Sequence, residues 1–122
     1  MPRARAHLTW DQALDRYQLH QRARRASPRT IEGHQREVRL LQAHLDEHEI
    51  GEVTLQDLRG YQVGLLTGAA SASGNPLCAR TAAKVTTSLR SFFGFLNDEG
   101  LLAENPALRL ERPKVGSSRP RS

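Results

Sequence analysis

The fold is decided by one stretch, Cys78–Gly100, which reads CARTAAKVTTSLRSFFGFLNDEG. Its apolar residues recur at the three- and four-residue steps of an amphipathic helix, so the spacing predicts one long helix with one side in a core. The buried side is expected to hold Val85, Leu89, Phe92, Phe93 and Leu96. The helix should end near Gly100, because glycine readily adopts the left-handed conformation that terminates helices.

The opposite side of this predicted helix is polar and carries Arg80, Lys84, Thr87 and Ser91. Cations bind phosphates or guanine, and small hydroxyls allow a helix to approach base edges closely. The pattern therefore favours a helix that reads DNA. An ordinary solvated surface is the alternative interpretation of the same residues.

The net charge of +5 is distributed unevenly along the 122 residues. Residues 1–29 carry seven arginines and two aspartates, and residues 109–122 carry five cations and one glutamate. Residues 30–108 carry six cations and ten acidic residues. A nucleic-acid partner would therefore have to meet the flanks and one selected face, since the average surface of the middle would repel it. Arg-rich tails that merely solubilise the chain are the alternative.

A first helix is predicted after Thr9, which can cap it, and its apolar stripe includes Tyr17. The run QRARRASPR, residues 21–29, follows as the densest positive patch and contains the turn signal Ser-Pro. A second helix is expected to start near Thr30, with His34 on its apolar stripe and Arg36 and Arg39 on the reverse side.

A short third helix should open at Thr54, because Thr54 and Asp57 resemble a capping box. After the long helix, Asn105-Pro106 begins another short turn or helix. No stretch alternates with period two over strand length, so we predict an all-α fold of four to five helices packed as an orthogonal bundle.

The same pattern divides the chain into a flexible basic arm at 1–7, a helical domain at 8–108 and a basic exit linker at 109–122. No run of 18 apolar residues occurs, so no membrane association is expected. The single cysteine, Cys78, excludes an internal disulfide and fits a reducing cytoplasm.

Candidates for chemistry within the chain are weak. His44 and His48 have the helical spacing of a zinc pair, but no third ligand is evident, and the metalloprotease pattern would need glutamate where Leu45 stands. GAASASG, residues 68–74, lacks the Gly-Lys-Ser/Thr ending of a phosphate loop. We therefore expect no catalytic residue, no metal and no cofactor, and no enzymatic activity from this chain alone.

Three segments in order resemble the N-terminal core-binding domain of tyrosine recombinases, the phage-integrase and Xer-like family. They are SPRTIEGHQREVRLLQAHL, VTLQDLRGY and ARTAAKVTTSLRSFFGFLNDEGLLAENPALRLERPK. The shared features are a Ser-x-x-Thr helix start, a later Thr-x-x-Lys/Arg helix ending in Leu-Arg-x-Phe-Phe, an acidic-Gly turn, Asn-Pro and a Pro-Lys exit. The resemblance covers roughly residues 8–115. It departs from the family at His34, where an aromatic residue is usual.

This resemblance implies a SAM-like helical domain that closes around duplex DNA together with a separate catalytic domain, its second and fourth helices lying against the major groove. The residues that would then contact DNA are Thr30, Arg36, Arg39, Arg80, Lys84, Thr87, Arg90, Ser91, Arg112 and Lys114. Of these, the residue at position 90 could instead form a pair within the domain, and the last two would follow the DNA backbone.

The partners implied are double-stranded DNA, the catalytic domain of the parent recombinase, and other copies of the chain on DNA. The expected function is to grip the arm of a recombination site and to position the catalytic domain. A helical protein–protein interaction module of a regulator, using the same apolar stripes, is the alternative.

Overall fold

The computed structural model describes residues 8–46 and 48–114, and within these ranges the chain is helical and forms no strand. The α-helices are α1 (Trp10–Ala23), α2 (Pro28–Leu45), α3 (Leu55–Thr67) and α4 (Ala79–Asp98), and a short 3₁₀ helix, η1, spans Ile50–Glu52. The all-α prediction is confirmed. The expected arm at 1–7 and the last part of the expected linker, 115–122, lie outside the described residues.

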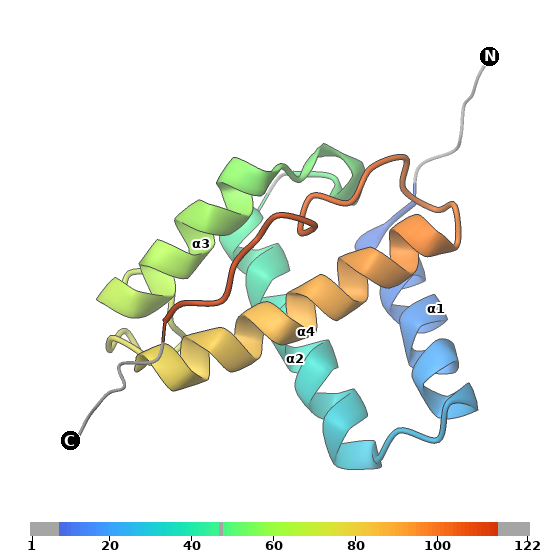
Figure 1. Ribbon diagram of the computed structural model, residues 1–122, viewed down its shortest axis with the longest axis horizontal. Helices are drawn as coiled ribbons and strands as arrows, with labels where there is room; N and C mark the ends of the chain where they lie inside the picture. The colour runs from blue at the N-terminus through green and yellow to red at the C-terminus, as the bar shows by residue number, and fades with distance from the viewer. Residues whose placement is uncertain (1–7, 47, 115–122) are drawn as a thin grey trace.

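Helix α4 is the centre of the fold and contacts each of the other three α-helices. Figure 1 shows it crossing in front of α2, with α1 and α3 on either side. Its apolar side is buried as predicted: Leu89, Phe92, Phe93 and Leu96 are all 0% exposed. The rings of Phe92 and Phe93 meet edge to face with their centroids 5.1 Å apart, an arrangement that aromatic quadrupoles favour.

The starts of the helices follow local capping chemistry. Thr9 and Thr54 each accept a hydrogen bond from a backbone N–H three residues on, and each forms a reciprocal capping box. Helix α2 begins earlier than expected, because Ser27 is its cap and Pro28 takes the first helical position. Proline is suited to that position, since its fixed φ is helical and no hydrogen-bond donor is needed there.

Three of the helix ends use a left-handed residue, and that of α3 is Gly68, with φ +92°. After α1, the N–H of Arg25 donates to the carbonyl of Arg22, and the N–H of Ala26 donates to the carbonyl of Gln21. These bonds form a Schellman motif, but an arginine with φ +63° occupies the position that glycine usually takes. After α4 the corresponding residue is Gly100, with φ +77°.

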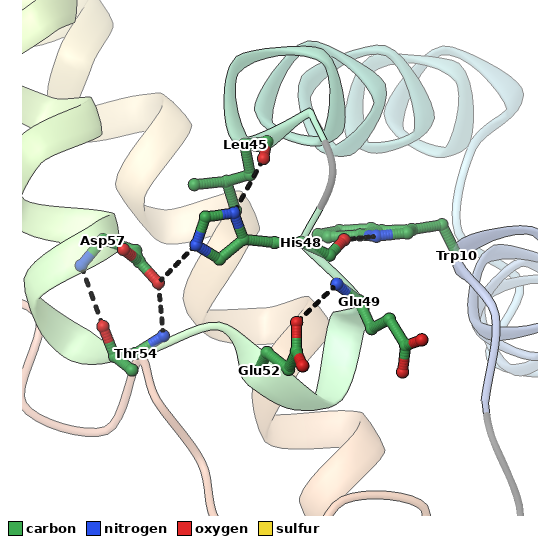
Figure 2. A network of polar contacts seen from close by, with 7 residues as sticks. All are labelled: Trp10, Leu45, His48, Glu49, Glu52, Thr54 and Asp57. Atoms are coloured by element: carbon green, nitrogen blue, oxygen red, sulfur yellow. Dashed lines mark hydrogen bonds and ion pairs between the residues drawn. The ribbon is translucent and has the colours of Figure 1, made fainter.

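The junction between α2 and α3 is held by a chain of polar contacts, shown in Figure 2. The indole of Trp10 donates to the carbonyl of His48 at 3.1 Å, and the His48 ring donates to the carbonyl of Leu45 at 2.8 Å. The other ring nitrogen of His48 lies 3.8 Å from a carboxylate oxygen of Asp57, which also accepts the backbone N–H of Thr54. The junction is therefore anchored to α1, α2 and α3 at once.

The chain after α4 returns along the bundle, and in Figure 1 its last described part runs between α3 and α4. Residues 106–109 form a turn rather than a further helix. Leu110 is 1% exposed, so the beginning of the expected exit linker is packed into the core. The amide of Gln62, on α3, donates to the hydroxyl of Thr86 at 2.8 Å and to the carbonyl of Glu111 at 2.7 Å.

Candidate nucleic-acid interface

The outward side of α4 carries the cations and hydroxyls that the sequence placed there. Arg80, Lys84, Thr87 and Ser91 are all exposed. Within residues 8–46 and 48–114, neither Arg80 nor Lys84 forms an ion pair. Their charges are therefore not neutralised by neighbouring carboxylates of the fold.

The returning C-terminal segment adds further cations beside this side of α4. Arg112 lines one depression of about 330 Å³ together with Thr87, Arg90 and Ser91. Arg90 is exposed and has no carboxylate partner among the described residues. The alternative of an ion pair within the domain is therefore not formed in this part of the chain. Lys114 is also exposed, at the end of the described chain. The structure thus brings the predicted residues of α4 and Arg112 together.

Helix α2 divides its predicted residues between two sides. His34 points toward α4, where the charge of Lys84 acts on it. Helix periodicity places Thr30 about 40° from His34, whereas Arg36 lies about 160° and Arg39 about 140° from it. Arg36 and Arg39 therefore face away from the cations of α4.

Arg39 also has partners within the fold. Its guanidinium lies 2.7 Å from a carboxylate oxygen of Asp11 on α1 and donates to the side chain of Gln42 at 2.9 Å. Both members of the ion pair are largely exposed, so the pair contributes little to stability. It nevertheless directs Arg39 toward α1.

A polar cluster lies beneath the α4 surface. The hydroxyl of Tyr17, which is 1% exposed, lies 2.6 Å from the hydroxyl of Ser91 and 2.9 Å from Nδ1 of His34. Burial raises the pKa of Tyr17, while the hydrogen bond from Ser91 and the charge of Arg24 act in the opposite direction. Burial lowers the pKa of His34; Glu37 raises it and Lys84 lowers it further.

Arg24 is not among the residues predicted to contact DNA, yet its charge lies close to the polar cluster. It caps the C-terminus of α1, is exposed, and lies near enough to Tyr17 for its charge to favour the phenolate. The signal in the sequence was the cluster of arginines at residues 21–29, but their distance from α4 could not be judged without the packing of α1. Arg24 extends the positive surface from α4 toward the α1–α2 turn.

A larger hollow than that beside Arg112 lies elsewhere. It measures about 1400 Å³ and is bordered by apolar residues of the C-terminal segment and by Glu49, Glu104 and Arg109. Its two carboxylates and one cation make it less favourable for phosphates than the outward side of α4. The two histidines considered for metal binding also have separate neighbours: His44 packs on the ring of Tyr61 with centroids 5.1 Å apart, and His48 belongs to the α2–α3 junction.

The described helices include none long and apolar enough to cross a membrane. The sequence profile of the phage integrase N-terminal SAM-like domain matches residues 14–100. The chain belongs to this family. The SAM-like fold expected from the sequence is thereby confirmed.

Curated relatives of this SAM-like domain are tyrosine recombinases. XerC of Alcanivorax borkumensis is 31% identical over 99 residues, which cover 81% of this chain and 30% of that protein. XerC of Nitrobacter winogradskyi is 32% identical over 112 residues, covering 90% of this chain and 35% of that protein. The chain thus spans about a third of the length of these relatives.

A solved structure shares the arrangement of helices. The integrase from mycobacterium phage Brujita superposes with a TM-score of 0.69 at 26% identity, over 88% of this chain and 34% of the integrase chain. The SAM-like domain described here is therefore similar to one part of a larger integrase.

Proposed function

We propose that this domain binds duplex DNA through the outward side of α4 and the N-terminal end of α2, and that it positions a separate catalytic domain on a recombination site. The observation that carries the proposal is a set of cations that have no acidic partner among the described residues, Arg80, Lys84 and Arg90, on one helix whose other side is fully buried. An α-helix fits the major groove of B-DNA, where cations and hydroxyls reach both base edges and phosphates.

Within this proposal the residues have different tasks. Lys84, Thr87 and Ser91 lie along the outward side of α4 and are placed to meet base edges, with Arg80 at its N-terminal end. Thr30 approaches from α2, on the same side of that helix as His34. These residues form the central part of the proposed interface.

The remaining predicted contacts are assigned to the DNA backbone. Arg90, Arg112 and Lys114 are exposed beside or beyond the central part and would meet phosphates. Arg36 and Arg39 face away from α4, so they contribute only if the duplex also passes the reverse side of α2. For Arg39 that contact would compete with Asp11.

We further propose that the chain neither cuts nor joins DNA. Its two tyrosines, Tyr17 and Tyr61, are each 1% exposed, so neither hydroxyl can attack a phosphate. Burial also raises the pKa of Tyr61 to about 12, which keeps it protonated and a poor nucleophile. Covalent attachment of the chain to a nicked suicide substrate would contradict this part of the proposal.

The rival function, a protein–protein module that uses the same apolar stripes, is less well supported. Leu89, Phe92, Phe93 and Leu96 are already buried within the domain and offer a partner no apolar surface. The exposed side of the same helix is cationic, and this favours an anionic partner.

A salt titration tests the proposal. If the 122-residue chain contacts about six phosphates, the logarithm of its association constant for duplex DNA should fall with the logarithm of salt concentration at a slope of about −5. A salt-independent affinity would overturn the proposal. Self-association on DNA stays a prediction, and the protein-to-DNA stoichiometry on longer duplexes would test it.

A further inference from the structure

The cluster beneath Ser91 connects a titratable ring to the proposed DNA surface. In the order of their contacts, its members are Gln21, His34, Tyr17 and Ser91. Nε2 of Gln21 lies 3.1 Å from Nδ1 of His34, which lies 2.9 Å from the Tyr17 hydroxyl, which lies 2.6 Å from the Ser91 hydroxyl. The rings of His34 and Tyr17 stack with centroids 5.8 Å apart and planes inclined by 11°.

The chemistry of Nδ1 limits the directions of these hydrogen bonds. A neutral imidazole with its proton on Nε2 offers one lone pair at Nδ1, and both the amide of Gln21 and the hydroxyl of Tyr17 can donate to it. When Tyr17 donates to Nδ1, the Tyr17 oxygen accepts from Ser91. When Gln21 donates instead, Tyr17 can donate to Ser91. Both directions of the Tyr17–Ser91 bond are therefore accessible while His34 is neutral.

Protonation of His34 leaves one direction. The imidazolium carries hydrogens on both nitrogens, so Nδ1 can no longer accept from Tyr17. The Tyr17 hydrogen then has the Ser91 oxygen as its acceptor, at 2.6 Å. Ser91 accepts this bond, and its own hydrogen is released to point outward.

We infer that protonation of His34, acting through Tyr17, fixes Ser91 as a hydrogen-bond donor toward DNA, whereas neutral His34 leaves Ser91 free to act as donor or acceptor. With His34 protonated, Ser91 becomes a donor, suited to a phosphate oxygen or to the acceptor atoms of guanine and thymine. With His34 neutral, Ser91 can instead donate its hydrogen to Tyr17, and it then presents only lone pairs to DNA. His34 and Tyr17 are thus positioning residues for a contact that itself rests on the proposed DNA-binding function.

An unpartnered atom supports two states of the cluster. Gln21 is 5% exposed, and within the described chain its side-chain oxygen is buried without a hydrogen-bond partner. Rotation of the amide by 180° would exchange its oxygen and nitrogen and bring the oxygen close to Nδ1 of His34. A protonated Nδ1 would then supply the donor that this oxygen lacks.

The charged groups around His34 and Tyr17 belong to α2 itself, to α4 and to the end of α1. Lys84 on α4 opposes its protonation and Glu37 on α2 favours it. On α1, Arg24 acts on Tyr17, and His20 stacks beside Tyr17 with centroids 6.3 Å apart. In the free domain, burial lowers the pKa of His34, so the ring is neutral at pH 7.

DNA should reverse this preference. Phosphates bound near Lys84 and Ser91 favour the imidazolium, so the pKa of His34 rises in the complex and binding takes up a proton. Affinity for DNA should therefore increase as pH falls through the window between the two pKa values, by at most about tenfold per pH unit for one proton.

A titration of the 122-residue chain without DNA tests the connection first. By NMR, the Cζ resonance of Tyr17 should shift with the same midpoint as the ring of His34. In Ser91→Ala the Tyr17 hydrogen loses its acceptor in the protonated state, so the His34 midpoint should move to lower pH. An unchanged midpoint, together with a Tyr17 resonance that ignores His34, would overturn the inference.

Binding of a DNA duplex at several pH values then tests the consequence. The parent chain and the matched variant His44→Phe, altered at the other end of α2, should bind more tightly as pH falls. His34→Phe should lose most of this dependence, and His34→Gln serves if the phenylalanine variant does not fold. Equal pH dependence in parent and His34 variants would overturn the inference but leave the proposed function intact. Failure to bind DNA at any pH, with the Tyr17–His34 connection present, would instead refute the proposed function.

Discussion

The α2–α3 junction and the outward side of α4 are both polar and exposed, but only the junction pairs its polar groups with partners within the fold. In the junction, Asp57 accepts the N–H of Thr54 and faces His48, whose backbone carbonyl binds Trp10 (Figure 2). On α4, the described chain supplies no carboxylate to Arg80 or Lys84.

The difference separates two uses of polar side chains. A group whose partners belong to the same fold holds local geometry, and its removal leaves those partners unsatisfied. A cation without such partners adds little to folding but keeps its charge available for an external anion. Substitutions in the junction should therefore change stability, and those on α4 should change DNA affinity.

The largest effect should come from the core that supports both regions. Phe92 is 0% exposed and meets the ring of Tyr17 with centroids 5.4 Å apart. Phe92→Ala should cost about 3–5 kcal/mol of unfolding free energy through the cavity it leaves. Urea denaturation measures this. Phe95→Ala, at a partly buried position of the same helix, should cost clearly less, and an equal cost would mean that the core is not centred as described.

Removing the unpaired cations should affect binding alone. Arg80→Ala and Lys84→Ala should each weaken DNA binding by about 1–3 kcal/mol if the side chain reads a base edge, and by less if it meets only phosphate. Thermal melts should match the parent.

The matched control for these two variants is Arg59→Ala, which removes an exposed cation from α3. Fluorescence titration of labelled duplex with all three variants makes the comparison. If the α3 variant loses as much affinity as the α4 variants, the effect is one of net charge, and the assignment of a specific face fails.

In the junction we expect a smaller effect, which lowers stability and leaves DNA affinity unchanged. Thr54→Ala removes the cap of α3, which accepts the N–H of Asp57 at 3.1 Å. The unfolding free energy should fall by about 1 kcal/mol, while DNA affinity measured under folded conditions should be unchanged. Thr54→Ser, which keeps the hydroxyl, should restore most of the stability. Loss of DNA affinity in a fully folded Thr54→Ala variant would show that the two regions are not separable.

The smallest effect concerns Arg25, which bears on both stability and DNA affinity. Its φ of +63° is strained for arginine, so Arg25→Gly should raise stability by about 0.5–1 kcal/mol. If its charge meets a phosphate, the salt slope of DNA binding should become shallower by about one in the same variant. Arg25→Ala keeps the strain and removes the charge, so it should share only the change in slope. Equal stability of the two variants would argue against strain at this turn.

Features set by residues close in the chain were predictable. The cap at Thr9 and the capping box at Thr54 each join residues three apart, the buried side of α4 follows from its period, and Gly100 ends that helix as its conformational freedom suggests. The predicted start of α2 near Thr30 lies two residues after the observed start at Pro28, because a Ser-Pro pair signals a turn while proline also suits a first helical position.

Features set by packing were not predictable. The contact between Tyr17 and Ser91 joins residues 74 positions apart, and no local pattern reports it. The small-residue loop after α3 gave no sign that it folds back, yet the N–H of Ala70 donates to the carbonyl of Gly64 at 2.9 Å. The periodicity of α2 predicted that Arg36 and Arg39 lie opposite His34, but only the packing shows that the His34 side is the one turned toward α4.

The double hydrogen bond of Gln62 has a mechanical consequence. The amide joins α3 to α4 through the hydroxyl of Thr86 and joins α3 to the C-terminal segment through the carbonyl of Glu111. Glu111 directly follows the buried Leu110. Tension applied at Lys114 would therefore load both helices together, before any helical turn could unwind. Gln62→Ala should lower the force at which this segment detaches from the bundle in an optical-tweezers experiment, because both of its hydrogen bonds to α4 and to Glu111 are lost.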